Sequence, residues 1–380
     1  MLKDTNLQIL EKNYEAVYSL FFEHEYLSKP QVAKLSGFSM PTVMSHIKRL
    51  EENSLIKKSR VLSAEIGRPA TAYSLNTDAK GSIGVEIMSD KIKCAVFNLK
   101  AQAIAKKTFT LKCTYSPYYP KNLCHVLKDF MSELNLGKEN VLGIGISLQA
   151  VVDSHGQNII YSRILPISNL DINFLESELK LPCRLFHDVE CAAINELWFS
   201  SDLGNAVFIS LSEHIGGCLI KDHKIESGKC GYAGALEHIE IEEKGRLCYC
   251  GKQGCLETYC SISALKKDSQ LDLKEFFSRL RDGGDRENKI WNDYLEHLSK
   301  ALSTVYLLLE RDIVLGGEMS SFLNSSDVLK LEELIKKRCT FQINGQFISI
   351  ATVERDAAIT GAALFFLSLA LPENLVKVAF

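Results

Sequence analysis

Four potential metal ligands occur within eighteen residues of this chain, namely His238, Cys248, Cys250 and Cys255. Three thiolates and one imidazole complete the tetrahedral shell of a structural zinc ion and leave no open position for a catalytic water. Gly251 and Gly254 allow the loop to fold back tightly enough for Cys250 and Cys255 to share the ion. The sequence therefore predicts a structural zinc site. The alternative is a chance cluster of reduced cysteines.

The chain as a whole reads as a cytoplasmic protein of more than one domain. Its 380 residues exceed the roughly 100–200 residues usual for one domain. Clustered cysteines in a long cytoplasmic chain bind metal more often than they form disulfides. The amino terminus mixes Lys and Glu into its apolar positions, unlike a signal peptide. No apolar run reaches the roughly 18 residues of a membrane span, so we expect no membrane insertion.

Residues 1–78 have the pattern of a helix-turn-helix. A first helix shows apolar residues at three- and four-residue intervals, namely Leu7, Leu10, Tyr14, Val17, Tyr18, Phe21 and Phe22. A short second helix follows Ser28 and ends at Gly37. A third begins after the capping residue Ser39 and buries Val43, Ile47 and Leu50. We predict that this third helix enters the DNA major groove.

Two short strands, 55–58 and 72–75, then predict a hairpin wing with Arg68 near its tip. From Lys29 to Arg68 there are eight basic and three acidic residues, a local charge of +5 in a chain of net charge −3. A local basic stripe favours a phosphate-binding surface. The residues predicted to contact DNA are Ser39, Thr42, Ser45, His46, Lys48, Arg49, Arg60 and Arg68. The alternative is a three-helix module that binds protein.

From Gly81 onward, strand-like runs alternate with helical ones, which predicts layered α/β structure. The expected strands are 82–87, 93–98, 141–148, 183–186 and 206–211. The expected helices include 123–134, 191–199 and a long one near 290–310. We therefore assign residues 79–380 to a second, α/β domain.

The metal-ligand segment resembles the signature of the ROK family, named for repressors, open reading frames and kinases. The family pattern runs from Ala-Gly-Glu-x-Gly-His through Cys-x-Cys-Gly-x-x-Gly-Cys-Leu-Glu. This chain matches the second half fully at 248–257, whereas the first half reads Ala-Gly-Ala-Leu-Glu-His at 233–238. The resemblance covers nearly the whole chain. It implies a two-lobed, actin-like ATPase fold of the sugar-kinase type, and regulators of transcription where a winged helix-turn-helix precedes it.

The phosphate-binding loops of the family's kinases are altered in this chain. Where the kinases have Asp-x-Gly-Gly-Thr, residues 86–90 read Glu-Ile-Met-Ser-Asp. The second loop, Gly-Thr-Gly-Ile-Gly-Gly-Gly in kinases, matches 212–218 and carries Glu213, although two central glycines and Gly316-Gly317 survive. Backbone N–H groups approach a polyphosphate only where side chains are absent, and added carboxylates repel it. We therefore predict that the chain is not an enzyme.

The resemblance implies three sugar-binding residues. Asp188 matches the family aspartate that acts as base on the sugar hydroxyl, and His238 matches the histidine that binds zinc and sugar together. Glu257 matches a carboxylate that accepts from ring hydroxyls. The departures are Ala235, His187, Glu237 and Gln149-Ala150, where the family has Glu, Asn, Gly and Pro-Gly. They allow a modified sugar, a weak ligand or none. A structural carboxylate at a helix start is the alternative for Asp188.

These patterns together predict a homodimeric repressor of carbohydrate-metabolism genes. Two recognition helices would bind a roughly palindromic DNA operator, and a sugar-type effector in the altered kinase cleft would control it. Two alternatives are kept. One is a regulator controlled by a protein partner without a small ligand, and the other is an ATP-dependent sugar kinase.

Overall fold

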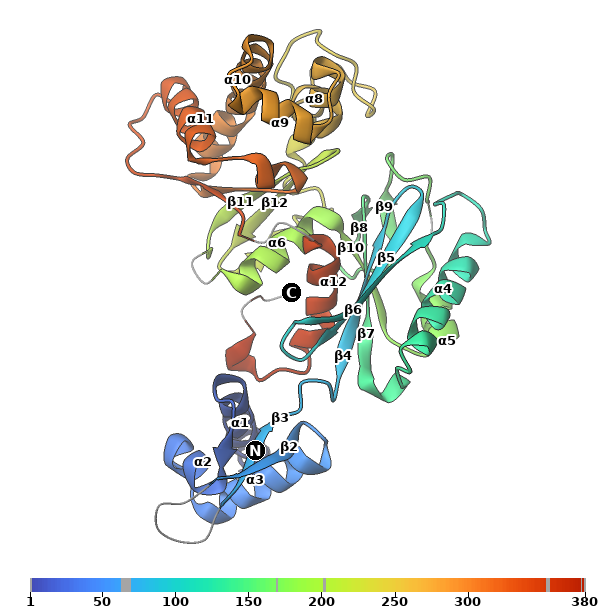
Figure 1. Ribbon diagram of the computed structural model, residues 1–380, viewed down its shortest axis with the longest axis vertical. Coiled ribbons are helices and arrows are strands. Elements are labelled where there is room, and N and C mark those ends of the chain that lie inside the picture. Colours follow the sequence, from blue (N-terminus) through green and yellow to red (C-terminus); the bar gives the residue numbers. More distant parts are fainter. Residues whose placement is uncertain are drawn as a thin grey trace.

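The computed structural model describes residues 2–62, 70–168, 170–200, 203–352, 356–376 and 378. It has a small amino-terminal domain and two α/β lobes (Figure 1). Among the described residues, no helix has the length and apolar character needed to cross a bilayer. The mixed α/β class and the two lobes confirm the fold class expected from the sequence.

The amino-terminal domain is a winged helix-turn-helix, as predicted. Its elements are α1 (Leu2–Glu23), β1 (Leu27–Ser28), α2 (Lys29–Ser36), α3 (Met40–Glu52), β2 (Ile56–Leu62) and β3 (Ala70–Leu75). The three strands form one sheet in the order β1-β3-β2. Gly37 ends α2 in the left-handed conformation (φ 71°), and Ser39 caps α3 by accepting a hydrogen bond from the Thr42 amide. The wing tip, including Arg68, lies outside the described residues.

A compact apolar core holds this domain together. Val17, Phe21, Val43 and Ile47 are fully buried at the contacts of α1 with the other two helices. Leu10, predicted on the buried face of α1, is 52% exposed because the core begins at Tyr14. The described side chains 8–10 of α1 therefore lie outside this core.

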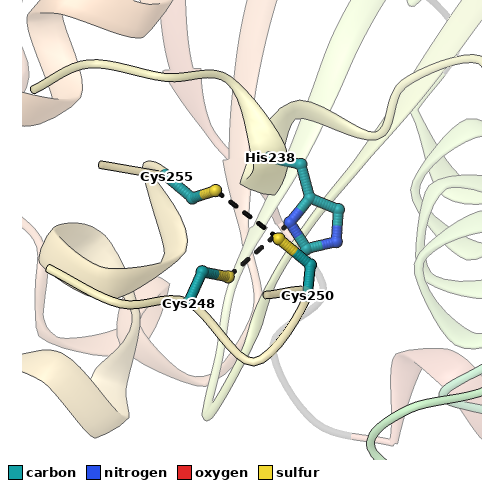
Figure 2. Close-up of side chains that lie close together, drawn as sticks. All are labelled: His238, Cys248, Cys250 and Cys255. Carbon is teal, nitrogen blue, oxygen red and sulfur yellow. Dashed lines mark hydrogen bonds between the residues drawn. The ribbon is translucent and has the colours of Figure 1, made fainter. Parts of the chain in front are cut away.

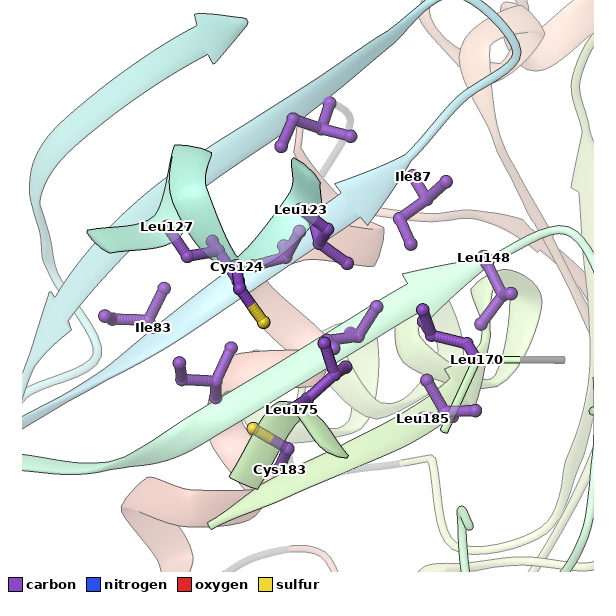
Figure 3. Close-up of a cluster of buried hydrophobic side chains, with 14 of the residues drawn as sticks. Ile83, Ile87, Leu123, Cys124, Leu127, Leu148, Leu170, Leu175, Cys183 and Leu185 are labelled. Atoms are coloured by element: carbon purple, nitrogen blue, oxygen red, sulfur yellow. The ribbon is translucent and has the colours of Figure 1, made fainter. Parts of the chain in front are cut away.

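The first lobe is built on a five-stranded sheet in the order β10-β7-β4-β5-β6. Its elements are β4 (Gly81–Ile87), β5 (Lys91–Asn98), β6 (Ala103–Thr110), α4 (Tyr119–Glu133), the 3-10 helix η1 (Lys138–Asn140), β7 (Val141–Leu148), β8 (Val151–Val152), β9 (Ile159–Tyr161), α5 (Ile172–Leu179) and β10 (Cys183–His187). Strands β4, β7 and β10 are parallel. Helices α4 and α5 cover one face, where Leu123, Leu127 and Leu175 fill the core (Figure 3).

The second lobe has a sheet in the order β13-β12-β11-β14-β15. Its elements are α6 (Asp188–Phe199), β11 (Ala206–Leu211), β12 (Ile215–Lys221), β13 (Lys224–Ile225), η2 (Leu236–His238), α7 (Glu257–Cys260), α8 (Ile262–Ser269), α9 (Leu273–Arg281), α10 (Asp285–Leu309), β14 (Asp312–Gly316), η3 (Glu318–Phe322), α11 (Ser325–Arg338) and β15 (Ile348–Ile350). Strand β3 ends at Leu75 and β4 begins at Gly81, and the domain boundary at 78/79 stays a prediction between them.

Helix α12 (Ala357–Ser368) and the 3-10 helix η4 (Glu373–Leu375) complete the chain's regular elements. Helix α12 packs directly on β4 and β7 of the first lobe and beside α6 (Figure 1). Glycine makes this close approach possible, because a Cβ at Gly84 would lie 2.1 Å from the Ile359 carbonyl oxygen and one at Gly145 2.0 Å from that of Ala362. Helices α6 and α12 therefore form the packed connection between the two lobes.

Candidate functional site

The four predicted metal ligands lie together in the structure. Their ligand atoms are all within 4.8 Å of one another. The Cys250 and Cys255 sulfurs are 3.7 Å apart, and the Cys248 sulfur is 3.8 Å from His238 Nδ1. Figure 2 shows the three cysteine side chains and this nitrogen converging on one point. The group can hold a metal ion.

This donor set fits a tetrahedral zinc ion. Zinc–sulfur bonds of about 2.3 Å at the tetrahedral angle separate two sulfurs by about 3.8 Å, close to the spacing found here. Gly251 and Gly254 adopt positive φ values of 90° and 78°, and a Cβ at Gly254 would lie 1.9 Å from the Glu242 carbonyl oxygen. The two glycines are thus required for the tight loop that brings Cys250 to Cys255, as the sequence predicted.

A cleft adjoins this metal centre at the junction of the lobes. The first lobe contributes residues that follow β7 and β9, and the second contributes the β11–β12 turn and the metal loop. Its polar lining includes Gln149, Arg163, His187, Asp188, His214, Glu237, His238 and Tyr249. Two of the three predicted sugar-binding residues, Asp188 and His238, therefore face one cavity.

Asp188 is the first residue of α6, where the positive end of the helix dipole favours a carboxylate. Its Oδ1 accepts a hydrogen bond of 2.9 Å from the Val189 amide and lies 3.4 Å from His187 Nε2. Burial raises the pKa of Asp188, although the neighbouring His187 opposes the shift. The side chain keeps 27% of its surface exposed. Asp188 thus stands at a helix start, as a structural carboxylate would, and it also lines the cleft, as a sugar-binding residue would.

His238 connects the metal centre to the cleft. Its Nδ1 faces the sulfurs, and Nε2, on the opposite edge of the ring, points away from them (Figure 2). The edge of Tyr249 packs against the rings of both His238 and His214, with centroid distances of 5.3 and 5.6 Å. An ion held by Nδ1 would fix the tautomer and leave Nε2–H as a donor.

Glu257 is paired within the protein, and its predicted contact with sugar hydroxyls stays a prediction. This carboxylate is 4% exposed, and both its oxygens are occupied within the protein. Oε1 lies 2.7 Å from His214 Nδ1, and Oε2 accepts a hydrogen bond of 2.8 Å from the Ile215 amide. Burial lowers the pKa of His214, but the hydrogen bond to Glu257 and the negative charges of Glu257, Glu213 and Asp188 together outweigh it, and the net shift is upward. Glu257 therefore holds His214 in place in this structure, and His214 is the member of the pair that lines the cleft.

Glu237 brings a carboxyl group into the cleft. Its side chain is 14% exposed, and its Oε2 is buried with no hydrogen-bond partner among the described residues. Burial raises the pKa of Glu237 to about 7. Ala235, two residues earlier, is exposed and offers no acceptor. The cleft thus has a carboxyl group at 237 and none at 235.

Sequence reasoning did not assign His214, Glu237 or Tyr249 to the site. Glu237 was visible as a departure from the family pattern. Tyr249 stands between two metal ligands, and its direction follows from the fold of their loop. His214 precedes β12 and depends on Glu257, forty-three residues away, for its orientation. Only the fold brings these three side chains together.

The altered phosphate loops carry paired carboxylates. Glu86 in β4 lies 3.0 Å from Lys93 Nζ of the adjacent strand β5. Glu213, in the β11–β12 turn, accepts hydrogen bonds from Lys266 at 2.7 Å and Ser263 at 2.8 Å. The second loop thus presents a fixed carboxylate where the kinase pattern has small residues.

The DNA-contact residues predicted on α3 divide into two groups. Ser39, Ser45 and Lys48 are exposed and Thr42 is half-buried, as expected for a DNA-facing surface. His46 corrects the prediction, because it is 5% exposed and packs edge-on against Tyr14 at 6.0 Å. It cannot reach DNA from there.

Arg49 is exposed, but its guanidinium is already engaged. It forms two hydrogen bonds of 2.6 Å with the Glu11 carboxylate and lies 4.1 Å from the centre of the Tyr14 ring. This geometry makes Arg49 a link between α1 and α3, and its predicted DNA contact stays a prediction. Arg60 lies in β2, and its side chain, like Arg68, is outside what the structure describes.

Known proteins share both the sequence pattern and the fold of this chain. The sequence profile of the ROK family matches residues 82–368, which is most of the chain. The chain belongs to the ROK family. Its curated relatives include the transcriptional dual regulator NagC of Escherichia coli, 25% identical over 82% of each chain. The xylose repressor of Caldicellulosiruptor bescii is 20% identical over 94% of this chain and 96% of the relative.

Solved ROK structures share the fold. A ROK family transcriptional regulator, a homologue of the E. coli Mlc protein, superposes with a TM-score of 0.77 and 21% identity, covering 97% of this chain and 99% of that one. A ROK glucokinase from Streptomyces griseus gives 0.65 and 19%, covering 75% and 98%. The regulator match includes the amino-terminal domain, whereas the kinase match leaves about that length uncovered.

Proposed function

We propose that this ROK protein is a DNA-binding transcriptional repressor of carbohydrate-metabolism genes, controlled by a sugar-type effector in the cleft between its lobes. The observation that carries the proposal is the joining of a winged helix-turn-helix to a ROK cleft that keeps hydroxyl-binding groups but carries carboxylates in its phosphate loops. Relatives that match most of the chain are named N-acetylglucosamine repressor and xylose repressor.

The cleft suits a polyhydroxylated ligand. Asp188 and Glu237 supply acceptors for hydroxyl groups, and His238 Nε2–H supplies a donor. Zinc, when bound by His238, Cys248, Cys250 and Cys255, would supply structural support for the loop that carries these groups. Glu237 has a buried oxygen with no hydrogen-bond partner among the described residues, which is energetically unfavourable. A ligand hydroxyl that donates a hydrogen bond to this oxygen would remove that cost.

The non-enzymatic assignment rests on charge. A nucleotide triphosphate is strongly anionic, and Glu213 is held by Lys266 and Ser263 at the turn that would cradle its phosphates. The side chain of Asp90 adds negative charge at the other loop, where the kinase pattern has Thr. Asp188 would then act as a hydrogen-bond acceptor rather than as a base.

Control of binding to a palindromic operator requires that the two recognition helices be held at a fixed separation. We propose a homodimer whose two α3 helices enter successive major grooves about one helical turn apart, with the exposed residues Ser39, Thr42, Ser45 and Lys48 facing the DNA and Arg60 and Arg68 on the wings. A change in the angle between the lobes, transmitted through α6 and α12, would alter that separation and release the operator.

A thermal-shift screen of the zinc-loaded protein tests the effector proposal, because a ligand that binds the native state raises its melting temperature. We expect a shift with a sugar or sugar derivative, none with ATP, and loss of the shift in Asp188→Asn. The surface variant Lys330→Ala, on α11, is the control and should retain it. A shift with ATP would revive the sugar kinase. No shift with any sugar would favour a protein partner as the controlling signal.

A further inference from the structure

The DNA-facing side of α3 exposes two methionines. Met40 and Met44 are 40% and 50% exposed, one helical turn apart. They lie in the amino-terminal half of the recognition helix, the part that usually contacts base edges. Ser45 and Lys48 are exposed beside them, so Met44 stands near the middle of the exposed face.

Few side chains on this helix can read bases by paired hydrogen bonds. Bidentate recognition of guanine uses Arg or Lys, and that of adenine uses Asn or Gln. Helix α3 contains neither Asn nor Gln, and Arg49 already donates both its terminal nitrogens to Glu11. His46 is buried against Tyr14. Lys48 is 76% exposed at the side chain and lies 3.7 Å from Glu52, so it remains a mobile charge suited to phosphate.

Thymine offers the complementary group. Its C5-methyl projects into the major groove, and proteins read it by apolar contact. A methionine side chain is long, unbranched and polarizable, so it adapts to a methyl group without a fixed geometry. The exposed thioether of Met44 therefore has a defined target in the groove that α3 would enter.

We propose that Met44 recognises thymine methyl groups in each operator half-site, with Met40 extending the same apolar surface. This inference rests on the DNA-binding function proposed above. It makes base specificity from α3 depend on methyl contacts more than on a hydrogen-bonded arginine or amide.

The thymine methyl can be removed chemically without changing base pairing, because deoxyuridine lacks only that group. The full-length zinc-loaded protein would first be used to select duplexes from a random pool, and the selected site would be resynthesised with deoxyuridine at one thymine position at a time. Burial of one methyl corresponds to about a four-fold change in affinity. We expect a loss of about that size at one or two positions of each half-site and no change at the others.

Substitution of the protein identifies the reader. Met44→Ala should weaken binding to the thymine duplex and abolish the difference between the thymine and deoxyuridine duplexes, whereas Met44→Leu should keep most of that difference. Leu10→Ala is the matched control, because Leu10 is 52% exposed but lies on α1. It should bind like the wild type. Since both positions are on the surface, circular dichroism is expected to show an unchanged fold.

The outcomes separate the inference from the function on which it rests. Selection that yields no bound duplex would overturn both the DNA-binding function and the role of Met44. A selected site that binds equally with thymine and deoxyuridine would overturn the role of Met44 alone. The same conclusion follows if Met44→Ala keeps the full discrimination, because another residue would then read the methyl groups.

Discussion

Substitution of Glu257 tests whether this residue positions His214 or binds a ligand directly. One of its oxygens accepts a hydrogen bond of 2.8 Å from the Ile215 amide, and the other lies 2.7 Å from His214 Nδ1. The side chains of Glu257 and His214 are 5% and 26% exposed, so solvent screens the pair weakly. A positioning residue should therefore stabilise the protein even when no effector is present.

Two variants should lower the free energy of unfolding by different amounts. Glu257→Gln keeps one oxygen for Ile215 but replaces the charged partner of His214 with an amide. Because bonds to charged groups contribute about 1.5–3 kcal/mol and neutral ones about 0.5–1.5 kcal/mol, we expect a loss of about 1–2 kcal/mol. Glu257→Ala leaves the Ile215 amide and His214 without a partner, and removal of one member of a buried pair costs about 3–5 kcal/mol.

Urea unfolding followed by tryptophan fluorescence measures these losses in the relevant domain. Both tryptophans, Trp198 and Trp291, lie outside residues 1–78, so the signal reports the ROK domain alone. The His214 pKa, followed by NMR, should fall in both variants. Glu237→Gln is the control and should not lower stability without ligand, because its Oε2 has no partner to lose. Unchanged stability and an unchanged His214 pKa in Glu257→Ala would refute the positioning role.

Three further predictions concern pH, metal and packing. The pKa of His214 is raised in the folded protein, so its contribution to stability is full below pH 6.5 and is lost as the pH rises through the folded pKa. The stability difference between wild type and His214→Gln should therefore shrink as the pH is raised above 6.5. Removal of zinc by a chelator, or Cys248→Ser, should lower the melting temperature and abolish effector binding, with metal content measured by atomic spectroscopy. Gly145→Ala should cost about 1–3 kcal/mol in urea unfolding, because its Cβ would lie 2.0 Å from the Ala362 carbonyl oxygen; no loss would contradict the close packing of α12.

The strands that the sequence predicted best are buried runs with clear ends. Val141–Leu148 and Ala206–Leu211 form β7 and β11 with the predicted bounds. Helix α12 was not predicted, because its sequence is apolar on nearly every side and lacks an amphipathic period. It is buried between the lobes, so no solvent-facing stripe marks it. Pattern alone cannot distinguish such a helix from a buried strand.

The site residues, too, were predictable where neighbouring residues determine their place and not where distant contacts do. The metal ligands were predictable because three of them lie within eight residues and their glycines define the loop. The assignment of His46 to the exposed face was wrong, although His46 follows Val43 by three residues and precedes Leu50 by four, which is the buried stripe of α3. The polar side chain obscured that periodicity. The pairing of Glu257 with His214 could not be predicted from the sequence, because that contact depends on the fold.

The position of Asp188 relates the cleft to the DNA-binding domain. Asp188 begins α6, α12 packs along α6 and on the first-lobe sheet, and η4, which follows α12, contacts α1 of the helix-turn-helix. A ligand that draws Asp188 toward His238 would therefore move α6 and α12. These helices are connected by continuous packing, through η4, to the helix-turn-helix domain. Packed helices shift as rigid bodies more readily than they deform, so under the control proposed above a small closure of the cleft would be converted into rotation of the domain that carries α3. A ligand hydroxyl that donates to Glu237 would give its buried Oε2 a partner, which would favour the ligand-bound arrangement.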